Sequence, residues 1–189
     1  MIKFGFYGED SKGRPIKIIQ CKQCNVGELF HQMGADNFFY FQIEQLEKVI
    51  NEVFVRCQHK YNRHIYSQIV IADVKHLEVI QILTNVQMLT FAKQKGFELQ
   101  LNYPELSFVA VIINAGPVFY TLWKFISVFL TKAALEKVRI CNDNYMPELL
   151  TILPVDKIPN SLGGTCPYDI DSYPNFYEQE LKESIQSDS

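Results

Sequence analysis

The chain has 189 residues, of which 48% are apolar and 21% are charged, and this composition is typical of a single globular domain and not of a disordered or collagen-like chain. Lysine and arginine together number 18 against 21 aspartates and glutamates, which gives a formal net charge of -3. Because no basic surplus exists to neutralise a phosphate backbone, we expect no nucleic-acid partner.

A turn, a strand and a short helix open the predicted fold. Residues 10–15 gather aspartate, serine, glycine and proline, which are common turn residues. Apolar Ile16 and Ile18 then alternate with polar residues, which is typical of a strand over 15–21. A helix is predicted over 26–33, and Gly34 is well placed to end it.

A long amphipathic helix follows. Asp36 can cap its start by accepting bonds from backbone N–H groups. From Ile43 to Cys57, apolar residues recur at steps of three and four, and the charged residues fall largely on the opposite side. The pattern predicts a helix with one face on the core.

The remaining strands alternate with helices. A strand over 66–73 ends at Asp73, and it is followed by a helix over 77–95 for which Gly96 is a plausible stop. The later elements are a strand over 107–114, a helix over 118–130, a short helix over 133–137, a strand over 138–141 and a helical turn over 145–150. This alternation predicts an α/β fold with a largely parallel sheet.

We expect a folded domain over 1–166 and an acidic tail over 167–189, which holds six acidic residues and one lysine. The uncharged run over 106–123 has the length of a membrane helix, but Asn-Ala-Gly-Pro interrupts it, so we interpret it as a strand, a turn and a helix. Five irregularly spaced cysteines, the missing glycosylation sequon and the lack of a leading signal segment favour a cytoplasmic location.

The helix predicted over 118–130 is apolar on two sides. One stripe holds Phe119, Trp123, Ile126 and Leu130, and a second holds Leu122, Phe125 and Phe129. Such a helix must be covered on both sides. Two interpretations stay open at this point: a central helix enclosed by the domain, or a helix with one stripe facing an apolar ligand or a membrane surface.

A series of short motifs, in a fixed order, resembles the CRAL-TRIO lipid-binding domain family. The series consists of the turn over 10–15, the strand over 69–73, Asn-Tyr-Pro-Glu over 102–105, Ile-Ile-Asn-Ala over 112–115, the aromatic helix, Lys137-Val138, Leu153-Pro154, Ile158-Pro159 and Leu-Gly-Gly over 162–164. The resemblance covers about residues 6–165. It implies a sheet floor with helices that form a hydrophobic cavity, closed by a gate helix after Ile-Asn-Ala.

The resemblance also implies a function and a set of residues. The function is the non-enzymatic binding of one lipid, such as a phosphoinositide, another phospholipid or a tocopherol- or retinoid-like molecule, with exchange during transient contact with a membrane surface. Neither a catalytic residue nor a metal or cofactor is implied. The cavity and gate positions are Val70, Ala72, Phe119, Leu122, Trp123, Ile126, Phe129 and Leu130.

For inositol phospholipids, the resemblance assigns the headgroup to Glu105 and Lys137. A carboxylate can accept bonds from sugar hydroxyls, and an ammonium can neutralise a phosphate. The alternative is that Glu105 pairs locally and that Lys137 is a solvated charge favoured by the dipole at a helix end.

Two other hypotheses remain. The family normally carries N-terminal helices, and only about a dozen residues precede the first predicted strand, so the chain could be a regulatory or interaction module without lipid transfer. Gln68 and Val70 also stand where relatives supply hydroxyls to a choline phospholipid. The pair Cys21 and Cys24 has redox or half-zinc spacing, but no second pair completes a metal site, so we interpret these cysteines as incidental.

Overall fold

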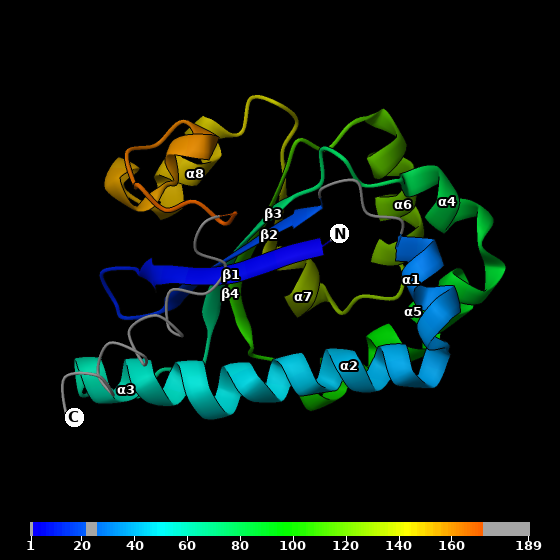
Figure 1. Ribbon diagram of the computed structural model, residues 1–189, viewed down its shortest axis with the longest axis horizontal. Helices are drawn as coiled ribbons and strands as arrows, with labels where there is room; N and C mark the ends of the chain where they lie inside the picture. Colours follow the sequence, from blue (N-terminus) through cyan, green and yellow to red (C-terminus); the bar gives the residue numbers. More distant parts are fainter. Residues whose placement is uncertain (1, 22–25, 172–189) are drawn as a thin grey trace.

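The computed structural model describes residues 2–21 and 26–171, which form a five-stranded sheet flanked by helices (Figure 1). The strands lie side by side in the order β1-β2-β3-β4-β5. They span β1 (Ile2–Glu9), β2 (Pro15–Cys21), β3 (Gln68–Asp73), β4 (Ser107–Ile113) and β5 (Val138–Ile140). Only β1 and β2 are antiparallel, and the other neighbouring strands are parallel. The predicted α/β class and largely parallel sheet are confirmed.

The helices connect the strands as crossovers. They are α1 (Val26–Met33), α2 (Ala35–Lys48), the π-helix η1 (Val49–Phe54), α3 (Val55–Tyr61), α4 (Val79–Thr84), α5 (Val86–Asn102), α6 (Pro117–Ser127), α7 (Lys132–Glu136), α8 (Met146–Ile152), and the 3-10 turns η2 (Val155–Lys157) and η3 (Asn160–Leu162). In Figure 1, α8 lies on one side of the sheet, and the continuous rod of α2, η1 and α3 runs along the other side.

The main hydrophobic core lies under α8, on the face of the sheet that we call the outer face. Its strand residues are almost completely buried and are Ile16, Ile18, Ile69, Ile71, Val111 and Ile113. Leu149 and Leu153 of α8 and Ile158 cover them. Burial of these large aliphatic side chains, at about 25 cal/mol per Å² of apolar surface, stabilises this half of the fold.

The beginning of the segment assigned to the acidic tail belongs to this core. Tyr168 and Ile170 are buried in it, and the ring of Tyr168 stacks on Tyr7 with 4.8 Å between centroids. Lys3 forms an ion pair with Asp171 at 2.6 Å. The division of the chain at residue 166 stays a prediction.

The first strand of the structure, β1, was not predicted. Gly5 and Gly8 interrupt its apolar residues, and glycine weakens a strand pattern because it has no side chain to pack. The strand forms because Phe6 is buried against η1 on one face and Tyr7 against α8 on the other.

The helix predicted over 77–95 is wrong in its extent. The chain breaks at Asn85, whose backbone is extended and whose side chain accepts a hydrogen bond from the Met88 N–H at 3.0 Å, so that α5 begins there. Gly96 does not end this helix, because α5 continues through it to Asn102. A single glycine costs a helix only about 1 kcal/mol, which the rest of a 17-residue helix tolerates.

The other helix ends were predicted with mixed success. Gly34 ends α1 as expected, with a positive φ of 76° and its N–H bonded to the Phe30 carbonyl. Asp36 does not cap α2, because Gly34 occupies the cap position and Asp36 lies in the first turn. The helix predicted over 118–130 ends at Ser127, so Phe129 and Leu130 lie beyond α6. Among the described residues, no helix has both the length and the apolar character needed to cross a bilayer.

Candidate functional site

The two faces of the sheet differ in how well they are covered. The parallel register aligns Lys17, Val70, Ala110 and Val138 in one row across four strands, and this row faces away from α8, on what we call the inner face. Along β4, outer-face residues are buried, whereas Ala110 and Ile112 of the inner face remain partly exposed. Central strands of a parallel sheet are normally buried on both faces, so apolar surface is left open here.

The helix α6 packs on the carboxyl end of this inner face. Phe119 and Leu122 are buried in a cluster with Val79 of α4, and Trp123 and Ile126 are partly buried against the same cluster. The sheet contributes Ile112 and Ile140 to the cluster. The structure therefore brings together four of the predicted cavity and gate residues, which are Phe119, Leu122, Trp123 and Ile126.

The other four predicted cavity residues lie nearby without joining that cluster. Val70 and Ala72 are on the inner face of β3, and Ala72 is aligned with Ile112. Phe129 and Leu130 follow α6 and are partly buried, and Phe129 packs edge-on against Phe125 at 5.4 Å.

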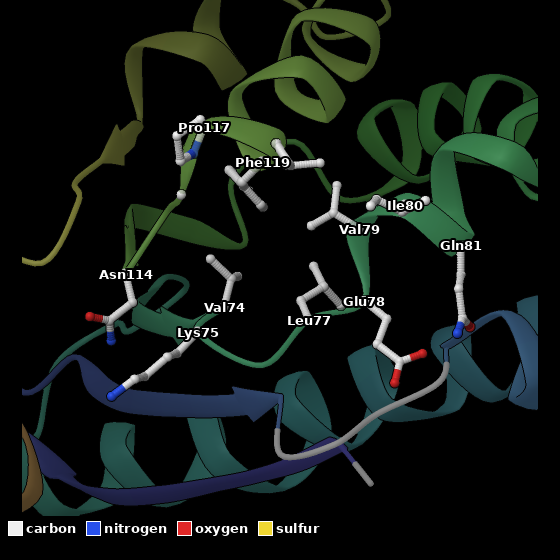
Figure 2. Close-up of a pocket in the computed structure, with 12 residues that line it drawn as sticks. Val74, Lys75, Leu77, Glu78, Val79, Ile80, Gln81, Asn114, Pro117 and Phe119 are labelled. Atoms are coloured by element: carbon white, nitrogen blue, oxygen red, sulfur yellow. The ribbon is translucent and has the colours of Figure 1, made fainter.

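A pocket of about 540 Å³ lies where α4 and α6 begin, at the carboxyl ends of β3 and β4. Its walls are the segments 74–81 and 114–119, and this volume lies within the range of small-molecule sites. Figure 2 shows Val74, Leu77 and Val79 in the space between the two segments, whereas Lys75 and Glu78 extend away from it. The pocket therefore has an apolar interior and a charged rim.

Asn114 fixes the shape of this pocket, although sequence analysis noted it only as part of a motif. Its backbone is left-handed, with a φ of 60°, which asparagine tolerates better than most residues. Its side-chain amide donates a hydrogen bond to Asp73 at 2.8 Å, and Asp73 also accepts one from the Lys75 N–H at 3.0 Å. These bonds join the ends of β3 and β4 at the pocket entrance.

The predicted headgroup residues, Glu105 and Lys137, are in contact. Their carboxylate oxygen and ammonium nitrogen lie 2.9 Å apart, and Lys137 also donates to the Pro104 carbonyl at 3.3 Å. The contact forms because Glu105 precedes β4 and Lys137 precedes its parallel neighbour β5, so both lie at the amino end of the sheet. The Glu105 side chain is 67% exposed, and such pairs contribute at most about 1 kcal/mol to stability.

A second, smaller pocket adjoins this ion pair. It has a volume of about 260 Å³ and is lined by Glu105 and Tyr103 from the loop before β4 and by Ile50 and Phe54 of η1. The Tyr103 hydroxyl donates to Glu47 of α2, and this bond raises the pKa of Tyr103. The site thus combines an apolar hollow with an exposed charge pair.

The cysteines do not form a site in the part of the chain that the structure describes. Cys21 is partly exposed and is a free thiol, and Cys24 lies outside the described residues. Burial raises the pKa of the Cys141 thiol, which opposes reactivity as a thiolate. Within residues 2–21 and 26–171, no group of three or more potential ligands could hold a metal ion.

Sequence analysis did not single out Lys17, which is a buried charge on the inner face. Its exposed fraction is 9%, and burial lowers its pKa to about 8. The alternation of β2 places Lys17 opposite Ile16 and Ile18, on what looks in the sequence like a solvent face. Because a parallel sheet is covered on both faces, the lysine inside a predicted central strand was the available signal.

The fold and this site define a lipid-cradle type of α/β domain, and the comparisons with known proteins agree. The family model described as the CRAL/TRIO domain matches residues 1–164, and the chain belongs to this family. A crystal structure of Sfh5 superposes with a TM-score of 0.66 over 90% of this chain and 56% of that one, at 18% sequence identity, which shows the fold alone.

Curated relatives carry names that refer to phospholipid transfer. Phosphatidylinositol/phosphatidylcholine transfer protein SFH9 of Arabidopsis thaliana is 30% identical over 86% of this chain, and SFH4 of the same plant is 29% identical over 86%. Sec14 cytosolic factor of Schizosaccharomyces pombe is 26% identical over 85%. The chain spans 28%, 26% and 55% of the lengths of these relatives.

Proposed function

We propose that the chain binds a hydrophobic lipid between the inner face of the sheet and the helix α6, and that it carries this lipid between membranes without a chemical step. The observation that carries the proposal is the partial exposure of the apolar inner face on the central strand β4. Water gains no hydrogen bonds on that surface. Each buried methylene contributes about 0.8 kcal/mol, so an acyl chain would be held there firmly.

The ion pair of Glu105 and Lys137 supports a phosphoinositide as the lipid. Lys137 can donate to a phosphate and Glu105 can accept bonds from the hydroxyls of an inositol ring. Because the pair is exposed, a headgroup can replace the mutual contact at low cost. Two of the relatives are named phosphatidylinositol/phosphatidylcholine transfer proteins, which supports the same ligand class.

Exchange requires contact with a membrane, and the outward side of α6 suits it. Exposed apolar residues follow this helix and the turn after it, and they are Val118, Tyr120, Phe125 and Val128. An apolar stripe next to the proposed binding space would allow α6 to move into the bilayer surface as a lipid enters. The name of the Schizosaccharomyces pombe relative, a cytosolic factor, supports action from the cytoplasm.

The test is transfer of fluorescent phosphatidylinositol and of a fluorescent neutral lipid between vesicles by the wild type and by Lys137→Ala. We expect the variant to lose about five- to tenfold of the phosphatidylinositol rate, because a charge-assisted contact disappears, and to keep the neutral-lipid rate. Lys132→Ala is the matched control, since Lys132 is 92% exposed on α7 and its removal changes the net charge equally.

Equal loss of both lipids in Lys137→Ala would mean that Lys137 serves folding. Absence of any transfer by the wild type, with lipid still bound after purification, would contradict transport and favour a regulatory lipid sensor.

A further inference from the structure

Lys17 is a buried cation with no polar partner among the described residues. Its contacts with other side chains are the rings of Phe4 and Phe6, whose centroids lie 5.0 and 5.7 Å from its ammonium nitrogen. Both rings belong to β1, which pairs with β2 so that Phe6 is directly opposite Lys17. The ammonium therefore lies over aromatic faces on the inner side of the sheet.

An ammonium in this position is costly for the folded protein. Removal of a cation from water without a counter-ion or hydrogen bond costs several kcal/mol, and ring faces return only a part of this. The lowered pKa of Lys17 reflects the same burial. An anion placed beside the ammonium would restore the lost interaction.

The surroundings of Lys17 fit the polar end of a lipid. Val70 and Ala110 continue its row toward the centre of the inner face and form an apolar floor. Gln68 is two residues before Val70, so it shares this face, and its buried amide oxygen has no hydrogen-bond partner within the described part of the chain. One donor cation and one unused acceptor thus border the floor.

This position is separate from the pair of Glu105 and Lys137. Lys17 and Val138 are three strand spacings apart in the aligned row, which corresponds to about 14 Å. A headgroup on Lys137 cannot also contact Lys17.

We propose that Lys17 selects lipids that carry a negatively charged group, a phosphate or a carboxylate, and that it binds this group at the β1–β2 side of the inner face. The inference rests on the proposed lipid binding and adds the chemical class of the ligand. Gln68 accepts a hydrogen bond from a hydroxyl or a protonated oxygen of the same ligand.

The experiment compares lipids that differ only in the acidic group. Phosphatidylcholine vesicles carry equal fractions of phosphatidic acid and diacylglycerol in one arm, and of oleic acid and oleyl alcohol in the other. The protein is incubated with the vesicles and re-isolated, and its bound lipids are quantified by mass spectrometry. The proteins are the wild type, Lys17→Met, Lys17→Arg and the control Lys12→Met, which removes an exposed lysine from the preceding turn.

We expect the wild type and Lys12→Met to prefer the acidic member of at least one pair by about tenfold or more, as for a charge-assisted hydrogen bond. Lys17→Met lowers this preference to near one and keeps its uptake of the uncharged member, whereas Lys17→Arg retains the preference. The arm that responds identifies phosphate or carboxylate as the bound group.

An unchanged preference in Lys17→Met, or a wild type with no preference in either arm, would overturn the role of Lys17 while leaving lipid binding in place. Failure of the wild type to take up any lipid would instead overturn the proposed function, and the inference with it.

Discussion

Replacement of Lys17 by methionine is expected to stabilise the protein. Methionine is an unbranched side chain of similar length without a charge, so it can occupy the place of the lysine stem beside Phe4 and Phe6. The variant removes the one cost that burial imposes on Lys17, which is the desolvation of its ammonium.

The magnitude follows from the pKa of Lys17. Burial lowers it from 10.5 to about 8, which corresponds to roughly 3 kcal/mol against the charged form in the folded protein. The rings of Phe4 and Phe6 offset about 1 kcal/mol of this. We therefore expect Lys17→Met to raise the free energy of unfolding by about 2 kcal/mol at pH 7, and the Tm by roughly 4–8 °C.

The gain depends on pH in a defined direction. Between pH 8 and 10.5 the unfolded chain keeps the proton on Lys17 while the folded chain loses it, so the stability contributed by this residue increases with pH. The penalty is fully present below pH 8 and falls below about 1 kcal/mol at pH 10. The advantage of the variant over the wild type must shrink accordingly.

Urea unfolding followed by circular dichroism, at pH 7 and at pH 10, measures this difference. Titration of all other groups cancels when the variant is compared with the wild type at the same pH. Lys12→Met, in an exposed position, is expected to change stability by less than about 0.5 kcal/mol. A destabilised Lys17→Met, or a gain that grows between pH 7 and pH 10, would refute the burial of an unpaired ammonium at this site.

Other predictions concern a close approach and the helix α6. Gly164→Ala places a Cβ 2.0 Å from the Ile158 carbonyl oxygen, so we expect a loss of about 2–3 kcal/mol in urea unfolding, whereas Gly116→Ala meets no atom within 4 Å and changes stability little; equal effects would contradict this packing. Trp123→Asp puts a charge into the apolar cluster under α6 and should lower lipid loading at least tenfold, measured by mass spectrometry of extracted lipid. Val128→Asp, at a 72% exposed position, should leave loading unchanged, and normal loading in Trp123→Asp would show that Trp123 does not face the lipid.

The alternation of strands and helices was sufficient to predict the fold class, because short β-branched runs and three-four apolar periodicity are local signals. The first strand escaped because Gly5 and Gly8 dilute its pattern, and its formation depends on contacts of Phe6 with η1 far along the chain. The break at Asn85 escaped for a related reason. An asparagine inside an apolar period is ambiguous until its side chain is seen to cap the next helix.

The candidate site shows the same limit. The resemblance paired Glu105 with Lys137, and the structure places them in contact because they precede neighbouring parallel strands. Their role with a headgroup stays a prediction. Lys17 could not be recognised as buried from β2 alone, since its burial comes from the opposing rings of β1 and from the helical layer above the inner face.

The most direct test of lipid binding is mass spectrometry of the organic extract of the natively purified protein, with denatured and refolded protein as the control. We expect one lipid class, bound at close to one molecule per chain, to appear in the native extract and to be absent from the control. A native protein that carries no lipid, and that takes up none from mixed phospholipid vesicles, would contradict the central claim that the inner face of the sheet holds a lipid.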